Sequence, residues 1–260
     1  MKQFYFSILV FISLSVFVTA QTNPTGASNE VGITEGDLSV TLSGGASYST
    51  PIAVPPGINN VQPEISLSYN SQGGVGSAGY GWNISGISSI SRIPATKFHD
   101  GVIDAVDFNA LDRFAIDGQR LVMKNPALTY GGDNIDYETE IYSNLKIKSF
   151  GVHPNGANYG PAYFTVEYPD GSKAYYGNST DSRSITEWSI TSWENAQGVK
   201  ILYSYNSSNN LLEIASIKYG SLGSASPINE IKFAYEASSR QENYYVGGQN
   251  IIRNKRLAKI

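Results

Sequence analysis

The sequence predicts an all-β protein in which multi-stranded antiparallel sheets of hairpins and meanders form a curved wall. Apolar and polar residues alternate over short stretches, as they do in strands that bury one face of a sheet. Turn-forming residues separate these stretches at short intervals, and helix signals are nearly absent. The alternation is clearest at Ile65, Leu67 and Tyr69, and it recurs over residues 164–168, 199–205 and 231–235.

Residues that favour turns mark the expected connections between these strands. They are Pro55-Pro56-Gly57, Asp117-Gly118, Pro169-Asp170-Gly171, residues 207–210 and Gly247-Gly248. The best helix candidate is residues 107–114, where we expect one short turn around Ala110 and Leu111. The pattern fits either one sheet system or two subdomains joined near residues 151–160.

Composition excludes several classes of protein. The 260 residues include 18 Lys and Arg against 22 Asp and Glu, a formal charge of −4, so we expect no nucleic-acid partner. The absence of cysteine excludes a disulfide scaffold, a zinc–thiolate site and a thiol nucleophile. Aromatic residues make up 12% of the chain, and 18 of them are tyrosines, whose rings we expect to pack across strands.

The first twenty residues have the pattern of a cleaved secretory signal peptide. Lys2 is the only charge before Glu30, residues 4–18 are almost all apolar, and Val18-Thr19-Ala20 offers small residues for cleavage. An uncleaved anchor helix is the alternative, but the apolar run is short for a membrane span of about 20 residues. We therefore expect a secreted protein without a stable membrane span. Its parts are a signal peptide (1–20), a flexible lead-in (21–37) and a β-rich module (38–260).

Residues 74–79 match the G-x-G-x-x-G pattern of dinucleotide-binding sites. That chemistry requires a helix directly after the glycines, so that its N-terminus meets the pyrophosphate. Here Tyr80-Gly81-Trp82 follows, which is typical of a strand or loop. We therefore expect the glycines to form a tight, closely packed connection and to bind no cofactor.

Two acidic segments resemble functional sites. Glu138-Thr139-Glu140 resembles the glutamate pair of ADP-ribosylating enzymes, but the arginine-bearing strand and Ser-Thr-Ser element of those enzymes are missing upstream, so a solvated strand edge is expected. A second segment has oxygen ligands suited to calcium, without the residue order of an EF-hand loop. Its residues are Asp100, Asp104, Asp107, Asn109 and Asp112.

The two histidines, His99 and His153, are more than fifty residues apart, and no serine stands in a nucleophile-elbow context. The many Asp and Glu residues offer acidic pairs for glycoside hydrolysis, but such pairs discriminate nothing. We therefore predict no catalytic residue, no metal ligand and no cofactor-binding residue.

The block from residue 44 to residue 92 is the most distinctive part of the chain. It resembles the N-terminal region of the Salmonella virulence plasmid B protein (SpvB) family, which the B components of insecticidal toxin complexes and secreted Rhs/YD-repeat proteins share. The matching residues are Pro51, Ile52, Pro56, Gly57, Pro63, Leu67, Tyr69, Ser71, Gly79, Gly81, Trp82, Ile90 and Arg92. Looser matches continue downstream, where residues 203–206 resemble one degenerate YD-type repeat.

The resemblance implies a non-catalytic structural module at the start of a larger protein, where it contributes to encapsulation or delivery of a toxin. It also implies protein partners from the rest of such an assembly, and it places toxin activity in a domain beyond Ile260. Because a module taken from a wall leaves edge strands unpaired, we expect self-association near residues 231–235 and 251–260.

A second hypothesis is a cell-surface or carbohydrate-binding β module that uses exposed aromatic side chains. The candidates are Trp188, Trp193, Tyr244 and Tyr245. A hydrolase has the least support.

Overall fold

The computed structural model describes residues 35–260, and nearly all of its regular structure is β-strand. Every strand pairing in this range is antiparallel, which confirms the predicted fold class. Within residues 35–260 the helical elements are one α-helical turn and two 3-10 turns: α2 (Lys97–Asp100), η2 (Ile58–Asn60) and η3 (Ala157–Tyr159). The predicted signal peptide (1–20) and residues 21–34 of the predicted lead-in lie outside the described residues.

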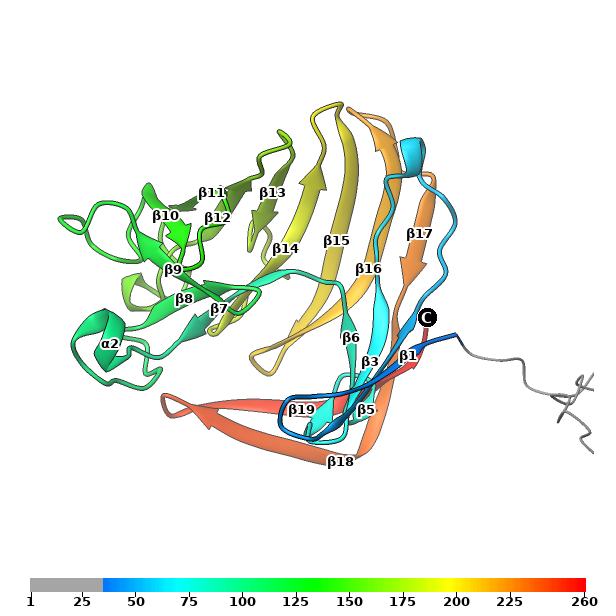
Figure 1. Cartoon of the computed structure of the whole chain (residues 1–260), viewed down its shortest axis with the longest axis horizontal. Helices are drawn as coiled ribbons and strands as arrows, with labels where there is room; N and C mark the ends of the chain where they lie inside the picture. The colour runs from blue at the N-terminus through cyan, green and yellow to red at the C-terminus, as the bar shows by residue number, and fades with distance from the viewer. Residues whose placement is uncertain (1–34) are drawn as a thin grey trace, which may run out of the picture. The chain divides into compact units, whose positions relative to one another are not determined.

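The first part of the described chain forms a six-stranded sheet in the order β1-β2-β3-β6-β5-β4 (Figure 1). Its strands are β1 (Asp37–Val40), β2 (Ala46–Pro51), β3 (Ser66–Asn70), β4 (Val75–Gly76), β5 (Gly79–Tyr80) and β6 (Trp82–Ser85). The register places Tyr48 opposite Tyr69 and Tyr69 opposite Trp82, so one face carries a row of aromatic side chains. The other face is rich in serine, and the hydroxyls of Ser68 and Ser85 lie 2.5 Å apart.

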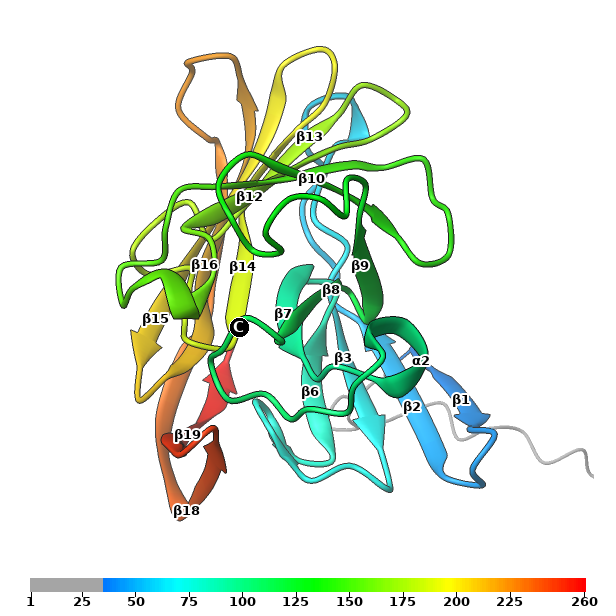
Figure 2. The same ribbon diagram turned by 90° about the vertical axis from the view of Figure 1, so that its left-hand side faces the viewer.

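The next eight strands close into a small barrel, which faces the viewer in Figure 2. β13 pairs with β12 on one edge and with β14 on the other, and β14 pairs with β7, which completes the ring. The strands are β7 (Ser89–Ile93), β8 (Arg113–Ile116), β9 (Gln119–Met123), β10 (Ile135–Thr139), β11 (Lys146–Phe150), β12 (Tyr163–Glu167), β13 (Lys173–Tyr176) and β14 (Glu187–Glu194). The sequence predicted a curved wall, and this part of the wall curves far enough to close.

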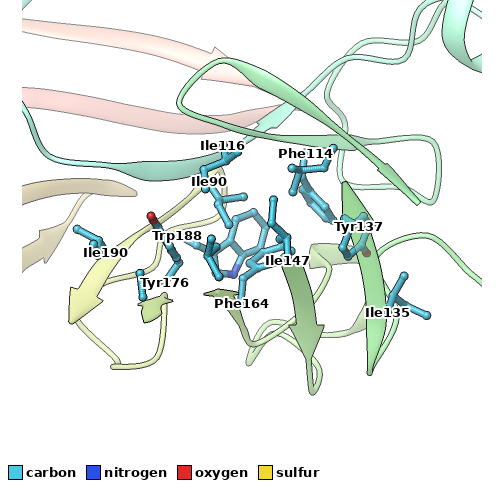
Figure 3. Close-up of a cluster of buried hydrophobic side chains, with 13 residues drawn as sticks. Ile90, Phe114, Ile116, Ile135, Tyr137, Ile147, Phe164, Tyr176, Trp188 and Ile190 are labelled. Atoms are coloured by element: carbon cyan, nitrogen blue, oxygen red, sulfur yellow. The ribbon is translucent and has the colours of Figure 1, made fainter. Parts of the chain in front are cut away.

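Side chains fill the barrel, as expected for eight strands. Trp188 is fully buried near the centre, with Phe114, Phe164 and Ile90 around it (Figure 3). Its ring meets Phe114 edge to face at 5.1 Å and Phe164 at 5.4 Å, and its Nε1 donates a hydrogen bond to the Pro161 carbonyl at 3.1 Å. Several of the aromatic residues of the sequence therefore form a packed core inside the barrel.

Strand β14 also begins an open extension of the same sheet, because the two halves of one of its edges have different partners. Residues 187–189 pair with β7, whereas residues 192–194 pair with β15, so β14 joins the barrel to an open extension. The extension consists of β15 (Val199–Ser208), β16 (Leu211–Leu222) and β17 (Asn229–Lys232). Barrel and extension thus form one continuous sheet, and residues 151–160 are only the connection between β11 and β12.

The chain continues into a long hairpin of β18 (Ala234–Val246) and β19 (Gln249–Lys259) (Figure 1). β19 contains the strand predicted near residues 251–260. Ile252 N–H donates to the Asn209 carbonyl at 3.2 Å, and Leu257 N–H donates to the Ser77 carbonyl at 2.7 Å. A second apolar cluster joins the hairpin and the six-stranded sheet to the extension. Its buried members are Ile65, Ile201, Tyr205, Ile214, Ile217, Tyr219 and Phe233.

Three of the predicted turns are confirmed as two-residue connections in which both residues have positive φ. Asp117-Gly118, Asn209-Asn210 and Gly247-Gly248 each connect two adjacent strands, and all six residues have φ between 46° and 81°. Two-residue hairpin loops favour this geometry because its twist matches that of the strands. At Gly247 a Cβ would also lie 2.8 Å from the Asp107 Cα, so the hairpin tip requires glycine.

The short turn expected around Ala110 and Leu111 is present, but residues 107–114 form no helix. These residues form turns that lead into β8 at Arg113. The Asp112 carboxylate accepts hydrogen bonds from the backbone N–H groups of Asp107 at 3.2 Å and Phe108 at 3.0 Å, and Phe108 has a φ of 64°. A side chain that satisfies backbone donors in this way competes with helical hydrogen bonding.

Candidate functional site

The motif residues of the six-stranded sheet form one aromatic cluster. The Trp82 ring lies 5.2 Å from the Tyr69 ring and 6.3 Å from the Tyr48 ring. Gly81 has a φ of 77°, and a Cβ there would lie 2.6 Å from the Tyr69 ring. The Gly-Trp pair is therefore explained by packing, because the tyrosine ring covers the glycine backbone.

The Pro-Pro-Gly element joins this sheet to the extension. Tyr219 in β16 donates its hydroxyl hydrogen to the Pro55 carbonyl at 2.7 Å, and the Pro56 carbonyl accepts a longer bond from a side chain in β17. At Gly57 a Cβ would lie only 1.8 Å from the Val61 carbonyl oxygen. The element is thus a close backbone crossing that permits no side chain at Gly57.

Four further motif residues have positions in the same sheet and linker. Pro51 ends β2, Leu67 lies in β3 opposite Ile84, and Gly79 lies in β5 with a φ of 128°. Pro63 is buried in the linker before β3. The motif residues of this sheet therefore shape its strands and turns.

The motif residue Arg92 in β7 forms hydrogen bonds to several other parts of the barrel. Its side chain is 1% exposed, and its Nη1 donates to Asp112 Oδ2 at 2.8 Å, a carboxylate that is also 1% exposed. Nε donates to the Ile185 carbonyl at 3.2 Å, and Nη2 donates to the Tyr159 carbonyl at 2.5 Å. One guanidinium therefore holds loops that follow β7, β11 and β13.

Aromatic rings complete the surroundings of Arg92. Its Cζ lies 5.4 Å from the ring centre of Phe108 and 5.5 Å from those of Phe114 and Trp188. Burial lowers the pKa of Arg92, and the nearby Asp112 carboxylate opposes this shift. Guanidinium remains protonated under such conditions, so a permanent charge lies at the mouth of the barrel.

The acidic residues considered as calcium ligands are used in separate interactions. Asp112 pairs with Arg92, Asp100 pairs with Arg113 at 2.7 Å and with Arg120, and Asp104 accepts from the Asn109 side chain. Burial alone would raise the pKa of Asp100, but the Thr96 N–H and the two arginines outweigh it and lower the pKa. Within residues 35–260 no three His, Asp or Glu side chains are grouped to hold a metal ion.

The Glu-Thr-Glu motif and the glycine-rich motif lie in strands and the connections next to them. Glu140 lies just after β10, and its Oε1 is 2.9 Å from Nε2 of the exposed His99, while Glu138 lies in β10 beside Val122 of β9. The glycines of residues 74–79 form the β4–β5 hairpin and open no helix, as expected. At Gly76 a Cβ would lie 2.1 Å from the Trp82 carbonyl, which explains the close packing.

The surface-aromatic hypothesis is wrong for Trp188, which fills the barrel. Strand alternation shows which residues share a face, but not which face is buried. Trp193 is partly buried beside both apolar clusters, whereas Tyr244 and Tyr245 are 44% and 69% exposed. The four aromatic residues therefore form no common surface platform.

His153 is buried beside the Arg92 loops. Its ring stacks on Tyr159 at 5.7 Å and meets Trp188 edge to face at 6.2 Å. Burial lowers its pKa to about 4; the charges of Arg183 and Arg92 add to this effect, and the Ser184 backbone opposes it. Sequence reasoning did not connect His153 with Arg183, since the two lie on different loops.

Within residues 35–260 no helix has the length and hydropathy needed to cross a bilayer. The geometry as a whole defines a β module whose distinctive residues shape the fold. The family model described as "Salmonella virulence plasmid 65kDa B protein" (SpvB) matches residues 40–218, and the chain belongs to this family.

Three solved structures place the fold in context. The N-terminal domain of effector protein SpvB from Salmonella typhimurium strain LT2 is 16% identical, with a TM-score of 0.60 over 80% of this chain and 84% of that chain. The TcdB2-TccC3 crystal structure is 17% identical, with a TM-score of 0.64 over 92% of this chain and 14% of that chain. The Photorhabdus luminescens Tc holotoxin pore is 17% identical, with a TM-score of 0.63 over 91% and 14%.

At these identities the likeness concerns the fold, and the chain spans 14% of the length of the TcdB2-TccC3 chain. No curated protein sequence gave a significant match.

Arg92→Met is expected to lower the free energy of unfolding by about 3–5 kcal/mol, because it leaves the Asp112 carboxylate buried without its cation. Arg92→Met/Asp112→Asn is expected to cost less than the sum of its single variants, since the amide keeps an acceptor and removes the charge. Urea denaturation measures each free energy. The exposed pair Arg256–Glu236 is the control, and Arg256→Met should cost less than about 1 kcal/mol. Additive losses at positions 92 and 112 would contradict the coupling.

Acid should destabilise the protein through His153. Between its usual pKa of 6.5 and its folded value of about 4, the unfolded chain binds a proton that the folded chain does not. The free energy of unfolding therefore falls as pH decreases through this window, and His153 adds nothing further below it.

Thermal melts between pH 7 and pH 4 measure this effect. His153→Asn, which keeps an acceptor for the Asn155 N–H, should flatten the dependence of melting temperature on pH. His99→Asn, at the exposed histidine, should keep most of the slope. Equal slopes in wild type and His153→Asn would rule out the assignment.

Proposed function

We propose that the chain is a secreted, non-catalytic structural module of a toxin-complex type assembly, where it contributes to encapsulation or delivery of a toxin. The likeness to TcdB2-TccC3 carries the proposal. It extends over 92% of this chain but only 14% of that one, so the matching region there is one part of a much larger protein.

The state of the charged side chains supports a role without catalysis. Asp112 and Asp100 are neutralised by arginines, and His153 is buried and neutral above a pH of about 4. Glu140 contacts His99 on the surface. General acid–base chemistry needs a group whose pKa lies near the working pH and which reaches a substrate, and these groups serve the fold instead.

The sheet edges support protein partners. β17 ends the large sheet and, among the described residues, pairs only with β16, near the edge expected at residues 231–235. Its charged residues Glu230 and Lys232 interact with each other at 3.4 Å, which protects that edge from unspecific pairing. β1 ends the other sheet with Leu38 and Val40 about 75% exposed. Both edges can therefore meet a neighbouring protein, β1 through exposed apolar side chains and β17 through charged ones.

Cross-linking in the organism that produces the chain tests the proposal. Lys218 and Lys232 border the β17 edge, and they should form cross-links to a second polypeptide in an assembly far larger than the 28.1 kDa chain. Lys173 lies in barrel strand β13 and is equally accessible, so it serves as the control with mainly internal cross-links. A 28 kDa monomer with internal cross-links only would contradict the proposal.

Variants separate assembly from catalysis in the same material. Leu38→Lys/Val40→Lys places two charges on the exposed strand and should release the chain from the assembly. Glu138→Gln/Glu140→Gln should leave both the assembly and its toxicity unchanged. Loss of toxicity in the glutamine variant with assembly intact would indicate catalysis by this chain.

A further inference from the structure

A cavity of about 370 Å³ lies where three loops of the barrel and extension meet. The loop after β11, the connection from β13 to β14 and the turn between β15 and β16 form its walls. Small-molecule sites usually have volumes of about 300–1,000 Å³ and a few convergent polar groups. The lining residues are His153, Pro154, Asn155, Thr180, Arg183, Ser184, Ile185, Ser207, Ser208, Asn209 and Asn210.

Arg183 is the only charged residue among those that line this cavity. Its Nη1 donates to the carbonyls of Ala162 and Gly177, both at 3.0 Å. Within residues 35–260 no hydrogen bond or ion pair joins its guanidinium to a carboxylate. Five other arginines do pair with Asp or Glu, namely Arg92, Arg113, Arg120, Arg240 and Arg256. The cavity therefore contains a half-buried guanidinium that lacks an anion.

His153 supplies a second donor at this place. Its Nδ1 accepts a hydrogen bond from the Asn155 N–H at 3.1 Å, so the proton of the neutral ring is on Nε2. Nε2 is buried and has no hydrogen-bond partner of normal geometry in residues 35–260. The cavity is thus lined by the unpaired guanidinium of Arg183 and by one buried imidazole donor whose nearest acceptor, the Ser184 backbone, is not in good hydrogen-bond geometry.

The other lining groups indicate the chemistry of a ligand. Thr180, Ser207 and Ser208 contribute hydroxyls, and Asn209 and Asn210 contribute amides. Such groups form hydrogen bonds with hydroxylated molecules. The neutral state of His153 leaves one positive charge in the cavity, which suits a monoanion better than a phosphate dianion. A guanidinium also matches the two oxygens of a carboxylate.

We propose that this cavity binds a hydroxylated carboxylate of the acidic-sugar class, with its carboxylate on Arg183 and its hydroxyls on the Thr, Ser and Asn side chains. The site does not depend on the exposed aromatic residues. It adds ligand binding to the structural role, and it does not require that role to be correct.

Titration calorimetry on the full chain with sodium D-glucuronate and D-galacturonate tests the proposal. At least one of them should give saturable binding that is at least about tenfold tighter than D-glucose, which has the hydroxyls but no charge. Inorganic phosphate should bind more weakly than that uronate. Absence of saturable uronate binding up to about 50 mM, or equal binding of glucose, would overturn the proposal.

Variants locate the binding. Arg183→Lys keeps the charge but loses the two-pronged donor, and should weaken uronate binding by at least about tenfold. Ser208→Trp, at an exposed position of the rim, should block the cavity without touching Arg183, so it remains informative if the Arg183 variant fails to fold. Arg256→Lys, at a paired arginine on β19, is the control and should bind like wild type. Unchanged binding in both cavity variants would place the ligand elsewhere and overturn the proposal.

Discussion

The guanidinium of Arg92 carries a permanent charge into a place that water does not reach, and every group around it is needed to offset that burial. A buried ion costs several kcal/mol unless a counter-charge and hydrogen bonds replace its water. Asp112 supplies the counter-charge, the carbonyls of Tyr159 and Ile185 accept two further bonds, and aromatic rings cover the remaining surface. These groups come from separate loops. If one loop is displaced, the buried charge loses part of its compensation, and the other loops lose stability with it.

This constraint extends into the rest of the fold through Trp188 and β14. Trp188 contacts Arg92 on one side and the barrel core on the other, so the loops and the core are ordered together. Trp188 lies in β14, and one edge of this strand pairs first with β7 and then with β15. The same strand therefore closes the barrel and begins the open extension. The surface edges and the cavity at Arg183 therefore rest on a framework that the Arg92 contacts hold in place.

Strands and tight turns could be predicted from the sequence because both depend on local chemistry. Alternation located β3, β12 and β15, and pairs such as Asp117-Gly118 predicted the hairpins. Barrel closure could not be predicted, because the pairing of β13 with β14 depends on long-range register. The resemblance identifies Arg92, but no local pattern pairs it with Asp112, which the sequence groups with the candidate calcium ligands. The Arg183 cavity was missed because its three loops meet only after the barrel has closed.

Hydrogen–deuterium exchange of the wild type and Arg92→Met tests whether the contacts of Arg92 hold the three loops in place. We predict that amide protection falls together in three segments, residues 107–112, 157–160 and 183–186, while the β4–β5 hairpin keeps its protection. Such a result would identify one buried charge as the common support of three distant loops. Loss of protection confined to β7, with the other segments unchanged, would contradict it.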